Sequence, residues 1–199
     1  MPFDRMAGAS VSERRSITKR LILLAALLFG VRVEAQAPMD ESQVKAMFVY
    51  NFLKFVEWPS ESIRTKDPFV VLIIGDGATA DATERFLESK TIGERPLFVR
   101  RTKWDQSLTG ARAVFVVERD PKKLRRILDA AAAAGVLTIG EGEGFATHGG
   151  VIGLLVENRK VRFDVDTTAA QVAGLRVSSK LLALTRVVRS STDRSGSQQ

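Results

Sequence analysis

The most informative hydrophobic pattern of this chain lies in residues 44–59, VKAMFVYNFLKFVEWP. Its apolar residues recur at intervals of three and four, the spacing of an amphipathic helix with about 3.6 residues per turn. The face expected to be buried carries Val44, Phe48, Val49, Phe52, Leu53, Phe55 and Val56. The pattern therefore predicts a helix that packs one side against the core of the domain.

Three further apolar residues, Met47, Tyr50 and Trp58, fall on the opposite side of this predicted helix, among the polar residues Lys54 and Glu57. A helix exposed to solvent on that side would be polar throughout. Either a second element of the same domain covers these three side chains, or they contact a partner. Apolar stripes at helical spacing are more often core.

The rest of the chain alternates short apolar runs with amphipathic segments. Strands are predicted at residues 69–74, 97–101, 113–117 and 136–139, of which 69–74 and 113–117 should be buried. One helix is predicted at 79–89. A second should begin at the cap Asp120 and Pro121 and end at Gly135. This alternation predicts βαβ units and mostly parallel pairing.

The C-terminal part has a different pattern. Residues 151–157 and 160–164 flank Asn158-Arg159 closely enough to form an antiparallel hairpin. Asp166 can cap a short helix ended by Gly174. A last helix should begin at Ser178 or Ser179, with Leu181, Leu184 and Val188 aligned. The fold class expected is a three-layer α/β domain: an open, mostly parallel sheet with helices on both faces and a C-terminal antiparallel hairpin.

The N-terminal residues have the pattern of an export signal. Arg14, Arg15, Lys19 and Arg20 precede an apolar run at 21–31, which is the length of a signal-peptide core and short for a membrane span. Cleavage before Gln36 fits best. A twin-arginine signal, or an uncleaved anchor, are the alternatives. We therefore expect a secretory signal at 1–37, one domain at 38–189 and a disordered tail at 190–199.

Composition narrows the class of partner. Of the formal charge of +7, residues 1–37 carry +3, from six basic and three acidic side chains, which leaves +4 for the rest. That charge is too low and too dispersed to favour nucleic acid as a partner. The chain has no cysteine, so it can form neither a disulfide nor a thiolate metal site.

The candidate chemistry is sparse. His148 is the one histidine of the chain and lies in a glycine-rich turn, which argues against a histidine metal site and a Ser-His-Asp triad. The turn 75–77 follows a predicted parallel strand, where ligands bind in open α/β sheets. The glycine-rich segment 140–144 carries two glutamates, which oppose a phosphate. We expect no catalytic site, no metal and no cofactor.

Four motifs resemble the YfiR-like family of exported proteins. They are Lys45-Ala46-x-Phe48-x-Tyr50-x-Phe52-x-Lys54-Phe55-x-x-Trp58-Pro59 (the opening motif), Gly149-Gly150-x-Ile152, Arg162-Phe163, and Gly174-Leu175-Arg176-Val177-Ser178-Ser179-Lys180-Leu181-Leu182 (the closing motif). The resemblance covers residues 44–188. It implies a periplasmic α/β protein that represses a membrane-bound diguanylate cyclase by binding the cyclase's periplasmic sensor region, which lowers cyclic di-GMP signalling and biofilm formation.

The resemblance also implies a homodimer and an outer-membrane lipoprotein that can sequester the repressor. Well-known members of the family carry cysteines, whereas this chain has none, so redox control is not expected here.

For the cyclase we expect Met47, Tyr50 and Trp58 as contact residues, with Lys54 and Glu57 as rim charges. Replacing Tyr50 and Trp58 with alanine should then weaken binding and leave the melting temperature nearly unchanged. The alternative is a periplasmic small-ligand sensor, with Asp76 in the turn and Arg176 and Lys180 holding an anion.

Overall fold

The computed structural model of the protein describes residues 40–59 and 68–188. These residues belong to one compact unit that spans Met39–Gln199. The expected signal peptide at 1–37 and the expected tail at 190–199 lie outside the described residues. None of the described helices is long and apolar enough to cross a membrane.

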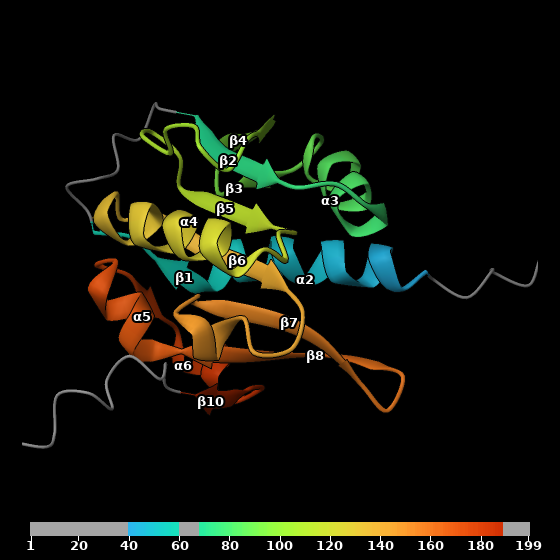
Figure 1. The fold of residues 1–199 in the computed structure, drawn as a ribbon. Helices are drawn as coiled ribbons and strands as arrows, with labels where there is room; N and C mark the ends of the chain where they lie inside the picture. Colours follow the sequence, from blue (N-terminus) through green and yellow to red (C-terminus); the bar gives the residue numbers. More distant parts are fainter. Residues whose placement is uncertain (1–39, 60–67, 189–199) are drawn as a thin grey trace, which may run out of the picture. The chain divides into compact units, whose positions relative to one another are not determined.

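One sheet of eight strands organises the described residues, in the order β10-β8-β7-β6-β5-β2-β4-β3 (Figure 1). The strands are β2 Phe69–Ile74, β3 Thr91–Ile92, β4 Arg95–Thr102, β5 Ala113–Val116, β6 Leu137–Glu141, β7 Ile152–Glu157, β8 Lys160–Asp166 and β10 Arg186–Val188. Pairing is parallel except for β7 with β8 and β3 with β4. The predicted α/β class, mostly parallel sheet and C-terminal hairpin are confirmed.

The helices are α2 Glu41–Phe55, α3 Ala78–Leu87, α4 Pro121–Ala133, α5 Thr167–Val172 and α6 Ser179–Leu182, with a short 3-10 turn, η2, at Ala146–His148. The predicted caps are confirmed. The Asp120 carboxylate accepts hydrogen bonds from the backbone N–H groups of Lys122 and Lys123. Asp166 caps α5 and Ser178 caps α6 in the same way.

Two local predictions at the C-terminus and in the opening helix are wrong. Helix α2 ends at Phe55, because Val56–Glu57 (β1) pair antiparallel with Arg176–Val177 (β9). The last helix ends at Leu182, and residues 186–188 instead add strand β10 to β8. In both places a backbone partner from a distant segment offers hydrogen bonds that local spacing does not reveal.

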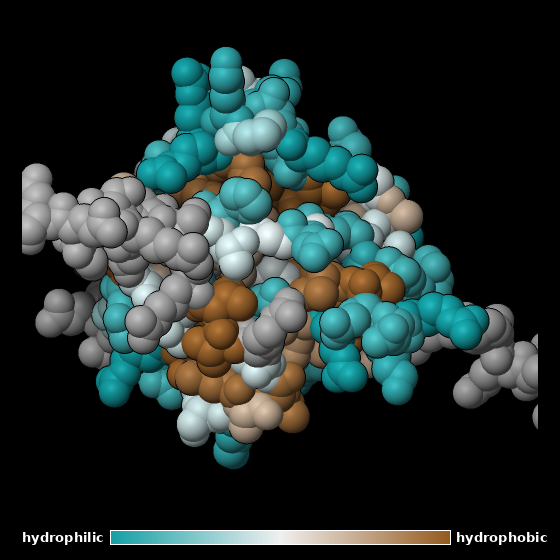
Figure 2. All heavy atoms as spheres, turned by 60° about the horizontal axis from the view of Figure 1, so that its bottom comes forward, coloured by the Kyte–Doolittle hydropathy of each residue, from teal (hydrophilic) through white to brown (hydrophobic). Residues whose placement is uncertain are grey.

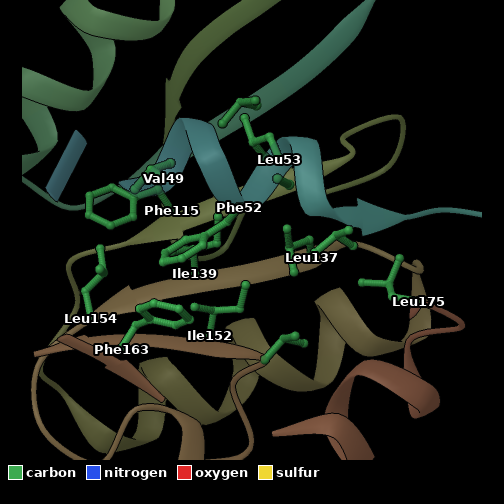
Figure 3. Close-up of a cluster of buried hydrophobic side chains, with 14 of the residues drawn as sticks. Val49, Phe52, Leu53, Phe115, Leu137, Ile139, Ile152, Leu154, Phe163 and Leu175 are labelled. Carbon is green, nitrogen blue, oxygen red and sulfur yellow. The ribbon is translucent and has the colours of Figure 1, made fainter. Parts of the chain in front are cut away.

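Helices cover both faces of the sheet, because alternate strand residues point to opposite sides. In β2, Val71 and Ile73 join the cluster around Val49 and Phe52 of α2. Leu72 and Ile74 join the cluster around Ile127 of α4. Figure 3 shows the α2 side, where side chains of the helix meet those of the strands, among them Phe115, Ile139, Ile152, Leu154 and Phe163.

The ring of Phe145 lies in a slot between Gly140 and Gly150 and packs against the cluster around Ile127 of α4. A Cβ atom at Gly140 would lie 2.1 Å from Cδ2 of this ring, and one at Gly150 would lie 2.1 Å from Cε1. Phe145 is itself buried. Glycine is required at both positions because the ring occupies the space of a side chain, which accounts for Gly150 in the Gly149-Gly150 motif.

This slot predicts a strong coupling between Gly140 and Phe145. Gly140→Ala should lower the free energy of unfolding in urea by about 1–3 kcal/mol, because the new methyl group overlaps the ring. In a Phe145→Ala background the same substitution should cost little, since the ring is gone. Equal costs in both backgrounds would show that the ring is not the obstacle.

Candidate functional sites on α2 and at the carboxyl ends of the strands

Tyr50 connects α2 to the neighbouring elements of the same chain. Its hydroxyl donates a hydrogen bond to the backbone oxygen of Thr91 in β3, at 3.0 Å. Its ring meets the ring of Phe86 in α3 edge-on, with 6.1 Å between centroids. The Nζ atom of Lys54 lies 4.6 Å from the Tyr50 ring centroid. A second element thus covers much of this side chain.

Trp58 follows the end of α2 and is also held within the domain. Its indole N–H donates to the backbone oxygen of Arg112, at 3.1 Å, just before β5. Its ring packs edge-on against Phe69 with 5.1 Å between centroids. Replacing Tyr50 and Trp58 with alanine should therefore destabilise the fold. The sequence alone led us to expect a nearly unchanged melting temperature for this variant.

The other three candidate contact residues face outward. Met47 is 37% exposed, and Lys54 and Glu57 are exposed as well. Met47 and Lys54 lie on one face of α2, seven positions apart, with Tyr50 between them. We call Met47, Tyr50 and Lys54 the α2 stripe. Partner binding by this stripe and by Glu57 and Trp58 stays a prediction.

The opening and closing motifs meet in space. Strand β1 pairs with β9, with Val56 opposite Val177 and Glu57 opposite Arg176. The backbone N–H of Ser178 donates to the backbone oxygen of Phe55, at 3.0 Å. The two ends of the family resemblance therefore form one structural unit, although more than 100 residues separate them in the sequence.

The residues proposed for an anion site do not come together. Asp76 follows the carboxyl end of β2, whereas Arg176 pairs with β1, next to Trp58 at the amino end of β5. Lys180 lies in α6 after β9. The Asp76 carboxylate is instead paired with Arg101, 3.1 Å away, and Arg101 also pairs with Asp81 and Glu84 of α3. These contacts tie the turn 75–77 to α3 and β4.

A cleft of about 990 Å³ opens elsewhere, where β5 and β6 end. Its wall is formed by the segments after these strands, the first half of α4 and the second half of β7. The lining combines apolar Leu128, Phe145 and Leu154 with charged Arg119 and Glu143. Clefts at the carboxyl ends of parallel strands are common ligand sites.

Lys45 of α2 also lines this cleft, and its side chain is only 5% exposed. Its Nζ atom lies 2.5 Å from Oε1 of Glu141, at the end of β6, and 2.6 Å from Oε1 of Glu41. Burial alone would lower the pKa of Lys45, because it disfavours the ammonium. The hydrogen bonds and charges of the two glutamates outweigh burial and hold the pKa above its ordinary value of 10.5.

Sequence reasoning missed both this pair and the cleft. The burial of Lys45 could have been predicted from its spacing, because Lys45, Val49 and Phe52 lie on one face of α2 at i, i+4 and i+7. A lysine on an apolar face needs a carboxylate partner. That partner, Glu141, lies 96 residues away and could not be identified from spacing.

The cleft is lined by one histidine and several carboxylates. Within residues 40–59 and 68–188, no group of three or more His, Asp or Glu side chains is placed to hold a metal ion. His148 lies at the cleft wall, and its Nδ1 atom contacts the backbone oxygen of Gly144. The arrangement can bind a ligand by its apolar floor and charged rim.

Residues 42–186 match the YfiR/HmsC-like protein family. The matched segment begins in α2 and ends in β10, so it includes the sheet, the cleft and both motifs. The match therefore covers well over half of the chain.

The Lys45 pair predicts a loss of stability at alkaline pH. Because the pKa of Lys45 is raised in the folded protein, the stability it contributes is present below about pH 10.5 and is lost as pH rises through the folded value. At neutral pH, Lys45→Met should cost about 1–3 kcal/mol, since Glu141 loses its partner.

Urea unfolding at a series of pH values tests this expectation. The difference between wild type and Lys45→Met should shrink as the solution becomes strongly alkaline, because methionine has no proton to lose. Lys54→Met, which removes an exposed lysine from the same helix, is the matched control. A difference that stays constant through the alkaline range would contradict the assignment.

Proposed function

Because the chain belongs to the YfiR/HmsC-like family, we propose that it represses a membrane-bound diguanylate cyclase by binding the cyclase's periplasmic sensor region. The family is periplasmic, regulatory and non-catalytic, and is linked to cyclic di-GMP signalling. In this proposal the protein is exported by its N-terminal signal, is not an enzyme and lowers biofilm formation.

The observation that supports a binding role is the outward side of the segment 44–59. Most of its aromatic and apolar side chains pack within the domain, and Lys45 is bound by two glutamates. Met47, Lys54 and Glu57 remain exposed. An exposed methionine on the same helix face as an exposed lysine suits a protein partner.

A second apolar surface lies on the C-terminal elements. Figure 2 brings the lower elements of Figure 1 forward and shows apolar side chains gathered on this face. Leu184, after α6, is 74% exposed and Val187 of β10 is 51% exposed. Exposed apolar patches often mark interaction surfaces. We propose that a homodimer or the outer-membrane lipoprotein partner uses this face.

Repression requires that the protein bind one state of the sensor region more tightly than the other. A change from a mostly active to a mostly inactive population takes a difference of about 5.5 kcal/mol. A few anchors can supply it, since truncating one at an interface commonly costs about 2 kcal/mol. A thiol switch is no part of the mechanism, because the chain has no cysteine.

The exposed residues allow a test that does not disturb the fold. The double variant Met47→Ala with Lys54→Glu should weaken binding to the purified periplasmic region of the partner cyclase at least about tenfold, or about 1.4 kcal/mol. The urea midpoint should change little, because both side chains are exposed. In cells, cyclic di-GMP and biofilm formation should rise.

The matched control replaces Val172 of α5 with alanine and Lys122 of α4 with glutamate, both exposed and away from the α2 stripe. The control should bind the cyclase as the wild type does. If the two double variants bind equally, the α2 stripe is not the contact surface. If the wild-type protein itself fails to bind the periplasmic region, the repressor proposal is wrong.

A periplasmic small-ligand sensor is the second candidate, and the cleft of about 990 Å³ favours it. Arg119 lines this cleft, and no described residue pairs with its guanidinium. A small anion with an apolar body would suit this arginine and the floor formed by Leu128 and Phe145.

Calorimetry of the whole protein with nucleotides, aromatic amino acids and cell-wall fragments tests this candidate. A ligand of the cleft should bind Arg119→Ala at least about tenfold more weakly than wild type. Lys122→Ala, which lies outside the cleft lining, should bind normally. The absence of binding heat with all three classes would dismiss the sensor function.

A further inference from the structure

Strand β4 has an outer edge that is mostly unpaired within the described residues. Strand β3 pairs with its first two residues alone, Ile92 with Arg95 and Thr91 with Pro96. The next outward hydrogen bond joins the N–H of Leu97 to the backbone oxygen of Lys90, at 3.0 Å. From residue 98 to residue 102, none of the described strands lies on this side of β4.

The direction of the free backbone groups follows from strand geometry. Successive residues of a strand point their N–H and C=O groups alternately to the two sides. Because Leu97 donates outward, Val99 and Arg101 also present their backbone groups to the open edge. Phe98, Arg100 and Thr102 direct theirs toward β2. The edge can therefore accept a further strand without breaking an existing pair.

One face of this edge is also uncovered. Phe98 is 56% exposed and stands opposite Val70 of β2, on the side of the sheet that α4 covers farther inward. Arg100 lies two residues along on the same face and is exposed. An exposed phenylalanine beside an open strand edge is unusual, because proteins normally protect such edges.

The charges at the edge indicate what can bind there. Arg101 is already paired with Asp76, Asp81 and Glu84. Arg100 and Lys103 are exposed, and no described carboxylate pairs with either. The unneutralised charge along the open part of β4 is therefore positive.

This charge disfavours a second copy of the chain at the same edge. Two copies related by a two-fold axis would place their β4 strands side by side. The Arg100 and Lys103 side chains of both copies would then gather along one junction, and like charges across neighbouring strands are destabilising. An acidic strand would instead be attracted to this edge, because its carboxylates would face the unpaired cations Arg100 and Lys103.

We propose that the free edge of β4, residues 98–102, binds an extended acidic segment of a protein partner as an added strand. The backbone groups of Val99 and Arg101 hold the segment, an apolar side chain of it packs on Phe98, and its carboxylates face Arg100 and Lys103. The same cations repel basic strands and so select the partner. This surface is separate from the α2 stripe, and the inference does not depend on which protein is bound.

Hydrogen exchange of the whole protein with a short capped peptide of alternating valine and glutamate tests the proposal. The peptide should slow exchange of the Val99 and Arg101 amides at least about tenfold, and leave the already paired amides of Phe98, Arg100 and Thr102 unchanged. A peptide of alternating valine and lysine should protect none of them. Salt should weaken the binding.

The variant Arg100→Glu with Lys103→Glu should lose this protection. The control, Lys122→Glu with Lys160→Glu, changes the net charge equally at exposed sites on α4 and β8 and should keep it. The proposal is overturned if the acidic peptide does not protect the Val99 and Arg101 amides, or if the Arg100→Glu/Lys103→Glu variant is protected as strongly as the wild type.

Discussion

The packing of α2 across the sheet is the interaction on which the other parts of this domain depend. Val49, Phe52 and Leu53 fill the space over β5 to β8, and the ring of Phe163 in β8 packs at a tilt against that of Phe52, with 4.9 Å between centroids. Burial of such side chains is worth about 1.5–3 kcal/mol each. Because α2 comes first in the described chain and contacts strands that come last, its position closes the fold.

Most of the residues that carry the family resemblance make the contacts that hold α2 in place. In the opening motif, Tyr50 binds β3, Trp58 binds the residue before β5, and residues 56–57 pair with the closing motif. Gly150, from another motif, leaves room for Phe145. Residues that distinguish a family can therefore be those that hold its fold, and within the segment 44–59 the candidate contact residues that remain exposed are Met47, Lys54 and Glu57.

The charged side chains of the described residues fall into two groups: some are paired within the domain, and others are exposed and unpaired. Two cations that are buried or partly buried are neutralised within the domain, Lys45 by Glu41 and Glu141, and Arg101 by three carboxylates. The unpaired charges lie at places open to other molecules, such as the cleft rim at Arg119 and the β4 edge at Arg100. Desolvation makes an unpaired buried charge costly, whereas an exposed one is available for recognition.

The sequence by itself determined the elements with local causes. The periodicity of residues 44–56 identified α2, the apolar run identified β2 at Phe69–Ile74, and side-chain caps placed the starts of α4, α5 and α6. Only the tertiary structure decided that Tyr50 and Trp58 are covered, that residues 186–188 form a strand, and that Lys45 meets Glu141. Those outcomes depend on contacts between segments 22 to 96 residues apart, whereas helical spacing and caps act within one or two turns.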